Sequence, residues 1–301
     1  MSVEKIIKNE PKAPSLERRD NRVGIYFLLP AIAVLLIIVA YPVIYSIVMS
    51  FFRWRPTEVS RPFVGMTNYK RVITDTRFII SIRNTFIYAI VGACFKVIIG
   101  MGLALMMNKK FFGRSLARVL LMLPWVIPVT ASVTTWNWMF DGMYGIFNTL
   151  LYRMGVIDSY INFLGMSGVA LACVLVVGIW MGYPQMMMML LAGLQSIPED
   201  IYEAARLDGA GPVRSFFSIT LPSLSNVLTM TIILSIIWTF NSFNVIWLMT
   251  RGGSNTHTMN TLAYEFSFVN MRYDLGAAMC VLILILLAIF LFIHSRMEKE
   301  D

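Results

Sequence analysis

The residues best suited to specific chemistry lie in a polar stretch, Pro198–Pro222, between two long apolar segments. It reads PEDIYEAARLDGAGPVRSFFSITLP and mixes acids, bases and helix breakers. Pro198 suits a first helical turn, and Glu199 and Asp200 place negative charge near the positive end of the helix dipole. We therefore expect a short helix whose small apolar face, with Glu203 beside it, consists of Ile201, Ala204, Ala205 and Asp208.

The second half of this stretch predicts a sharp turn and another short helix. Gly209 and Gly211 can supply the positive φ that ends a helix, and Pro212 suits the start of the next one. We expect Leu221 and Pro222 to end that helix and to open the following apolar segment. Such a loop can dock on a partner protein; an ordinary amphipathic loop between two membrane spans is the alternative.

A second candidate site lies in the later apolar segment WTFNSFNVIWLMTRGG. Hydroxyl and amide side chains alternate there with aromatic rings, a composition that fits a sugar, which has apolar C–H faces and a polar rim. Hydrogen bonding between neighbouring helices is the alternative use of these side chains. The residues concerned are Trp238, Thr239, Phe240, Asn241, Ser242, Phe243 and Asn244.

Lys96 is a third candidate, because it lies near the middle of an apolar segment between Arg83 and Lys109. A charge at the centre of a membrane costs about 2.5–3.5 kcal/mol on insertion scales, so it should face protein or a wet cavity. None of the apolar segments contains an acid to pair with it. Two interpretations stay open: a lysine that reaches the membrane surface or bonds helix carbonyls, and a lysine that lines a translocation route.

The composition of the chain indicates the environment in which these residues lie. The 301 residues are 57% hydrophobic and only 14% charged, with a mean hydropathy of +0.69, whereas soluble domains are roughly 25% charged. We therefore predict an all-α polytopic membrane protein. The net charge of +8 comes from flanks and loops, which is a topology pattern rather than a nucleic-acid surface.

The cysteines and histidines of the chain are not predicted to form a disulfide framework or a metal site. The three cysteines, Cys94, Cys173 and Cys280, lie in apolar segments and imply no disulfide framework. The two histidines, His257 and His294, are too few and too far apart in sequence for us to expect a metal site.

Six membrane spans are expected, with both termini on the same side. Counting basic residues gives 14 on the side of the termini and 10 on the other, which weakly favours cytoplasmic termini. The predicted organisation is a tail over 1–22, a six-span domain over 23–296 that includes the loop 198–222, and a tail over 297–301. The predicted spans are Gly24–Met49, Arg83–Lys109, Val119–Phe140, Gly168–Leu194, Ser225–Met249 and Leu275–Ile293.

The polar stretch resembles the signature loop of the permease subunits of bacterial ABC importers. That pattern is Glu-Ala-Ala, three residues, Gly, nine residues, Ile, one residue, Leu-Pro, and the sequence matches it at Glu203, Ala204, Ala205, Gly209, Ile219, Leu221 and Pro222. The outside-loop residues Phe63-Val64-Gly65 and Asn68-Tyr69, together with the tryptophan-rich spans, are similar to the maltose-type branch that takes up carbohydrates. The resemblance extends from about Tyr26 to Leu291.

The resemblance implies a type I importer permease whose signature loop forms a coupling helix on an ATPase subunit. It implies a second, homologous permease subunit in a probable heterodimer, two ATPase subunits, and an extracytoplasmic binding protein. The implied coupling residues are Glu203, Ala204, Ala205, Asp208 and Gly209. The implied substrate path includes Gly182, Gln185, Trp238, Thr239 and Ser242, to which the composition adds Asn241 and Asn244.

The sequence contains no energy source of its own. It has no G-x-x-x-x-G-K-[ST] phosphate loop and no HExxH zinc motif, and no catalytic set is visible, so we expect a transport subunit that is not an enzyme. No cofactor is expected on this chain, and ATP and Mg²⁺ would be used by the partner ATPases. The alternatives are an ABC permease for a non-sugar solute and, less consistently with the absence of intramembrane acids, an ion-coupled secondary transporter.

Overall fold

The structure is a computed structural model that describes residues 27–297. The predicted N-terminal tail, residues 23–26 of the predicted span domain and residues 298–301 lie outside the described residues. In the described part all regular structure is helical apart from one antiparallel bridge between Phe52 and Phe63. The all-α prediction is therefore confirmed.

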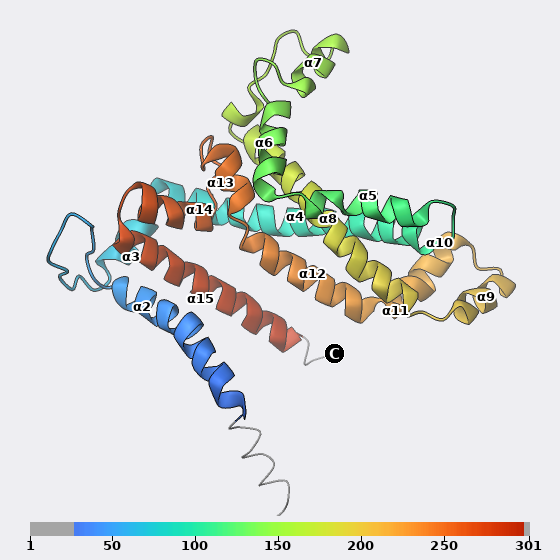
Figure 1. Cartoon of the computed structure of the whole chain (residues 1–301), viewed down its shortest axis with the longest axis horizontal. Coiled ribbons are helices and arrows are strands. Elements are labelled where there is room, and N and C mark those ends of the chain that lie inside the picture. Colours follow the sequence, from blue (N-terminus) through green and yellow to red (C-terminus); the bar gives the residue numbers. More distant parts are fainter. Residues whose placement is uncertain (1–26, 298–301) are drawn as a thin grey trace, which may run out of the picture.

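Five helical segments of this part are long and apolar enough to cross a membrane, and a bent helix pair makes a sixth if it counts as one span. The five are Phe27–Met49, which ends in η3 (Leu36–Ala40) and α2 (Tyr41–Met49); α4 (Thr76–Asn108); α8 (Val169–Gln195); Ser225–Thr250, made of α12 (Ser225–Phe240) and α13 (Asn244–Thr250); and α15 (Tyr273–Met297). Helix α4 packs between α8 and α12, and these three form the centre of the bundle (Figure 1).

The predicted third span is not one straight helix. It consists of α5 (Arg114–Val126) and α6 (Val129–Met139), which are bent by 89° at Ile127 and Pro128. Both of these residues have extended backbone angles. The residue before a proline is pushed out of the helical region, and proline has no N–H to continue the helix, so Pro128 breaks the span.

The polar segment 53–83 that precedes the predicted second span is partly helical, which corrects the expected start of that span. It contains α3 (Thr67–Ile73), and α4 begins at Thr76 rather than near Asn84. The Asp75 side chain accepts from the N–H of Arg77 at 2.9 Å and so caps α4 at this earlier position. Helix α4 consequently extends two turns beyond the apolar segment.

Short helices fill the remaining connections. After α6 come the surface helix α7 (Ile146–Arg153) and then η4 (Phe163–Gly165). Between α13 and α15 lie α14 (Met259–Tyr264) and η6 (Glu265–Val269). The loop 198–222 and its continuation hold α9 (Glu199–Leu207), α10 (Pro212–Ser215), η5 (Phe216–Thr220) and α11 (Leu221–Ser223).

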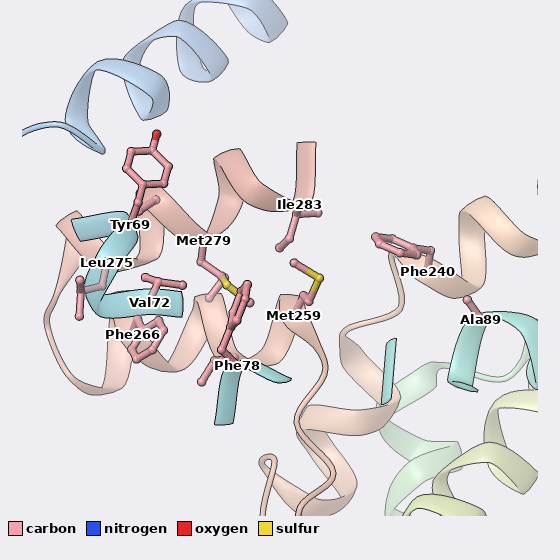
Figure 2. Close-up of a cluster of buried hydrophobic side chains, with 13 residues drawn as sticks. Tyr69, Val72, Phe78, Ala89, Phe240, Met259, Phe266, Leu275, Met279 and Ile283 are labelled. Carbon is pink, nitrogen blue, oxygen red and sulfur yellow. The ribbon is translucent and has the colours of Figure 1, made fainter. Parts of the chain in front are cut away.

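Two hydrophobic clusters mark the two ends of the bundle. We call the end formed by α3, α14 and η6 the α14 end; its cluster includes Tyr69, Phe78, Met259, Phe266 and Met279 (Figure 2). We call the end formed by α9, α10 and α11 the α9 end; its cluster joins the C-terminal parts of α4 and α8 to Leu224. Met186 and Met187, the first two of four consecutive methionines, are buried there and pack in the core.

Candidate functional site

The predicted two-helix loop is present at the α9 end. Helix α9 begins at Glu199 directly after Pro198, and Gly209 has a φ of +78° where the helix ends. Pro212 is the first residue of α10. Gly211 differs from the prediction, because its φ of −71° is one that any residue adopts. One glycine therefore makes the left-handed turn, and Gly211 only extends the connection.

The second helix of the loop does not end at Pro222. The chain continues through η5 and α11 and bends at Leu224 before α12 begins at Ser225. Leu224 is fully buried in the cluster of the α9 end, so the loop is joined to the bundle core by a nearly continuous helical segment. Helices α10 and α12 are thereby joined through η5, α11 and the buried Leu224.

The polar contacts between α9 and the rest of the described chain lie on one side of the helix. The Tyr202 hydroxyl and the Thr220 Oγ1 are 2.9 Å apart, which ties α9 to η5. Glu199 and Lys110 approach at 3.6 Å, but both side chains are at least 80% exposed, so this surface pair contributes little. Helix α9 projects beyond the ends of the long helices (Figure 1).

The predicted coupling residues lie on the accessible side of this loop. Glu203, Ala204, Asp208 and Gly209 are exposed, and Ala205 is half-buried. Apolar side chains accompany them: Leu207 is 90% exposed, Val213 72% and Phe217 61%. Exposed apolar groups beside an acid are typical of a protein-docking surface.

The first turns of α5 stabilise the neighbouring end of α4. Arg114 Nε donates to the carbonyl of Met107 at 2.6 Å, and Arg118 Nη2 donates to the same carbonyl at 3.4 Å. Basic side chains at a helix C-terminus satisfy its last carbonyls and interact favourably with the dipole. These two arginines therefore fix the start of α5 against the last turn of α4.

The second site is centred on Lys96, halfway along the bundle. The Lys96 ammonium donates to Thr239 Oγ1 at 2.8 Å, and it lies against Gly182 of α8. Thr239 is buried, and its methyl group faces Gly92. The structure thus brings together α4, α8 and α12 through two residues of the predicted path, Thr239 and Gly182, and the lysine.

The other residues of the predicted path are more scattered. Ser242 and Asn241 lie in the break between α12 and α13; Asn241 is exposed and bonds the carbonyl of Ile237 in its own helix at 2.9 Å. Gln185 is half-buried on α8, while Trp238 and Asn244 are exposed. Ser242 also faces the hydroxyl of Tyr88, a buried residue of α4 that the sequence interpretation did not identify.

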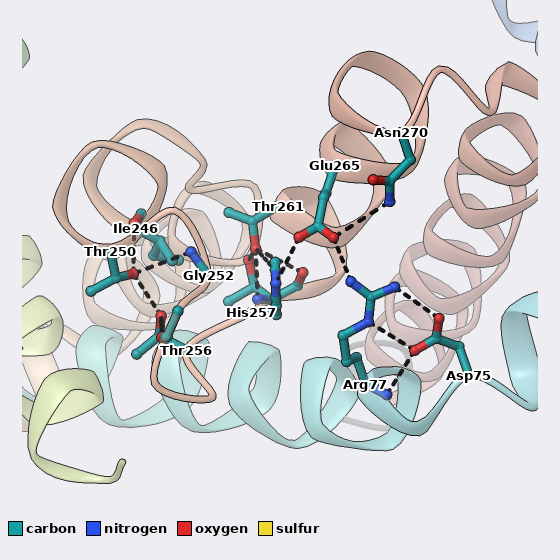
Figure 3. A network of polar contacts seen from close by, with 12 residues as sticks. Asp75, Arg77, Ile246, Thr250, Gly252, Thr256, His257, Thr261, Glu265 and Asn270 are labelled. Atoms are coloured by element: carbon teal, nitrogen blue, oxygen red, sulfur yellow. Dashed lines mark hydrogen bonds and ion pairs between the residues drawn. The ribbon is translucent and has the colours of Figure 1, made fainter. Parts of the chain in front are cut away.

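A polar cluster at the α14 end was not predicted at all (Figure 3). Arg77 makes a two-pronged pair with Asp75, with Nε–Oδ1 at 3.0 Å and Nη2–Oδ2 at 2.9 Å, and its Nη1 also pairs with Glu265. The other carboxylate oxygen of Glu265 lies 2.9 Å from His257 Nε2. We call these four residues the charged cluster.

The environment of the charged cluster shifts the pKa values of Asp75, Arg77 and His257, and the hydrogen bond to Asp75 raises that of Arg77. The hydrogen bonds from Arg77 hold the pKa of Asp75 below its usual value, although burial opposes this. Burial holds the pKa of His257 below its usual value, against the opposing effect of Glu265. At neutral pH His257 is therefore uncharged, and with its proton on Nε2 it donates a hydrogen bond to the Glu265 carboxylate.

Neighbouring hydrogen bonds fasten the same region to α4. The buried Asn84 side chain donates to the carbonyls of Asn255 and His257 at 2.6 and 3.0 Å, and Thr85 Oγ1 accepts from the N–H of Met259 at 2.9 Å. The only sequence signal was that Asn84 and Thr85 interrupt an apolar pattern. Their partners are about 170 residues away in the chain, so local patterns could not reveal the contacts.

Three comparisons relate the chain to known proteins. The family described as "Binding-protein-dependent transport system inner membrane component" matches residues 96–297. The trehalose/maltose transport system permease protein MalF of Thermococcus litoralis is 34% identical, over 94% of this chain and 96% of its own. The diacetylchitobiose uptake system permease protein DasB of Streptomyces coelicolor is 32% identical, over 91% of this chain and 87% of its own.

Among solved structures, a chain of a bacterial ABC transporter involved in the import of the acidic polysaccharide alginate superposes with a TM-score of 0.80. The match covers 94% of this chain and 97% of that chain at 22% identity, so it supports the fold. The permease architecture expected from the resemblance is therefore confirmed.

Proposed function

The chain belongs to the family of binding-protein-dependent transport system inner membrane components, and from that premise we propose that it imports a sugar or sugar-like solute as one permease subunit of an ATP-driven ABC transporter. The named functions of two relatives, trehalose/maltose transport and diacetylchitobiose uptake, support the carbohydrate class. The main support for the proposal is that α9 is exposed at one end of the helix bundle. Proteins of this family work together with other subunits, and an exposed helix there is available to bind one.

In this proposal α9 is the coupling helix that docks on an ATPase subunit. Glu203 supplies a charged contact, Ala204 and Ala205 allow close approach, and Asp208 and Gly209 shape the turn into α10. The exposed Leu207 and Val213 add apolar contact area on the same loop. Closure of the ATPases moves α9, and the helical connection through Leu224 carries that motion to α12 and its contact with Lys96.

The proposed assembly contains two ATPase subunits, a second and homologous permease subunit, and an extracytoplasmic solute-binding protein. ATP and Mg²⁺ are bound by the ATPases and not by this chain. A periplasmic protein carrying an alginate pentasaccharide occurs in the complex of one structural neighbour, which supports a binding protein as the donor of the solute. The chain lies in the inner membrane with both termini and α9 on the cytoplasmic side.

The proposed substrate path runs between α4, α8 and α12. Gly182 and Thr239 contact Lys96 directly, and Ser242 lies one turn away beside Tyr88. Gln185, Trp238, Asn241 and Asn244 complete the proposed path from α8 and from the break between α12 and α13. Aromatic faces and hydrogen-bonding side chains in this arrangement suit a sugar.

The test is uptake by the complete transporter reconstituted in proteoliposomes with the Glu203→Lys or Gly209→Pro variant. Both should lower ATP-driven uptake at least about tenfold, which corresponds to about 1.4 kcal/mol of lost coupling, while the variants remain in the membrane. Asp158→Lys makes the same charge reversal at an exposed position outside the α9 end and should leave uptake unchanged. Full uptake by both loop variants would contradict the coupling role.

A further inference from the structure

Lys96 occupies a position that the fold has shaped for it. At about 1.5 Å per residue it lies about 30 Å from the first residue of α4 and about 18 Å from the last, well inside the span. Its aliphatic stem crosses Gly182, where an added Cβ would approach the Lys96 Cε to 2.6 Å and Nζ to 3.1 Å. Gly182 thus keeps open the space that the ammonium occupies.

The hydrogen-bond partner of Lys96 is held just as specifically. A Cβ added at Gly92, one turn before Lys96 on α4, would lie 3.1 Å from the Thr239 methyl group. That close packing turns the Thr239 hydroxyl toward the ammonium, 2.8 Å away. Two glycines on two helices therefore accommodate the same lysine–threonine pair, which argues against a lysine that merely extends to the membrane surface.

The positive charge has no counter-charge in this part of the molecule. Among residues 27–297 no carboxylate pairs with Lys96, and no Asp or Glu lies at membrane depth in any of the spans. Thr239 is neutral and accepts one bond, whereas an ammonium has three donors. The remaining two donors and the whole charge are left for a group that the described chain does not provide.

A charge at this depth is costly unless it is paired, so its retention points to a partner that arrives with the cargo. An ammonium donates a charge-assisted hydrogen bond even to a neutral sugar hydroxyl, but that bond leaves the positive charge uncancelled. A carboxylate, sulfonate or phosphate on the solute accepts the bond as an anion and so cancels the charge as well.

We propose that Lys96 contacts the solute in transit and makes the transporter selective for anionic sugars, meaning sugars that carry a carboxylate, sulfonate or phosphate group. Thr239 orients the ammonium, and Gly182 leaves room for the lysine side chain. This proposal rests on the proposed import function and adds the charge class of the cargo to it.

The test measures binding to the complete transporter complex in lipid nanodiscs, without the binding protein, so that the permease site alone is probed. The probes are glucuronate and glucose, which are similar in size and differ in charge, and calorimetric titration gives both affinities. The wild-type complex should bind glucuronate at least about tenfold more tightly than glucose. Lys96→Met should reduce that ratio to about one, and Lys96→Arg, which keeps the charge, should retain most of it.

Equal affinities in the wild type, or no binding of either probe, would overturn the proposal, and so would an unchanged preference in Lys96→Met. If Lys96→Met fails to assemble, Lys96→Gln takes its place, and the wild-type ratio decides the matter independently of any variant. Uptake that responds to Glu203→Lys but shows no charge preference refutes this inference while leaving the import function standing. Uptake that is indifferent to Glu203→Lys refutes the coupling role instead.

Discussion

Both ends of the bundle contain charged residues in an otherwise apolar chain, but these charges are paired at one end and exposed at the other. At the α14 end, Asp75, Arg77, His257 and Glu265 satisfy one another inside the chain. At the α9 end, Glu203 and Asp208 are exposed on a helix that projects from the bundle. Charges paired within the chain stabilise the fold, whereas charges left on an accessible surface are free to bind another protein.

This difference predicts opposite consequences of mutation at the two ends. Substitutions in the charged cluster should lower the free energy of unfolding more than they lower the coupling of ATP hydrolysis to uptake. Substitutions on α9 should reduce coupling and leave stability nearly unchanged.

Arg77→Met should have the largest effect on stability, because it leaves the carboxylates of Asp75 and Glu265 without their shared cation. We expect a loss of roughly 1–3 kcal/mol, moderated by the partial exposure of the site. Thermal unfolding of the purified permease would show it, with Arg83→Met, an exposed arginine on the same helix, as the matched control. An unchanged melting temperature in Arg77→Met would mean that the cluster does not hold the α14 end together.

The pH dependence of stability should be smaller and should depend on His257. Because its folded pKa is lowered, the folded state binds fewer protons than the unfolded state once the pH falls below the unfolded value of about 6.5. Stability should therefore be complete above that pH and decline as the pH falls toward the folded pKa.

Thermal unfolding measured at several pH values, with and without His257→Gln, would isolate this contribution. The variant should lose the part of the slope that begins near pH 6.5, while the steeper loss at lower pH, where Asp75 is protonated, should persist. Identical slopes in the two proteins would show that His257 does not titrate differently on folding.

The smallest effect on stability is expected at Leu207, whose side chain is almost fully exposed on α9. Leu207→Ser should change the free energy of unfolding by no more than about 0.5 kcal/mol, as is usual for surface sites. Uptake by the reconstituted complex should nevertheless fall several-fold, because an apolar contact with the ATPase is lost. The equally exposed Phe112 lies on another loop, and Phe112→Ser is the control that should leave uptake intact.

The α9 end was predictable because its information is local. Helix start signals, the glycine at the turn and the proline of the next helix all act within a few residues, so α9, Gly209 and Pro212 were placed correctly. Gly211 was assigned a left-handed conformation that it does not adopt, because the sequence does not say which of two nearby glycines makes the turn.

The third span shows a different limit. Pro124 and Pro128 were both visible in the sequence, yet only Pro128 breaks the helix, while Pro124 is accommodated inside α5. Membrane helices tolerate prolines when neighbouring groups satisfy the freed carbonyls. Whether a given proline bends its helix by 89° therefore depends on packing around it, which the apolar pattern does not contain.

The sequence by itself determined the class of protein, the number of apolar segments and the two-helix loop 198–222, because hydropathy and turn chemistry are read over short windows. Only the tertiary structure joined Asn84 to Asn255, Arg77 to Glu265 and Lys96 to Thr239. These partners are far apart in sequence, and each contact exists because α4 packs at the centre of the bundle. The sequence alone indicated the charged residues of α9, whereas only the helices packed around Lys96 show that its charge is unpaired.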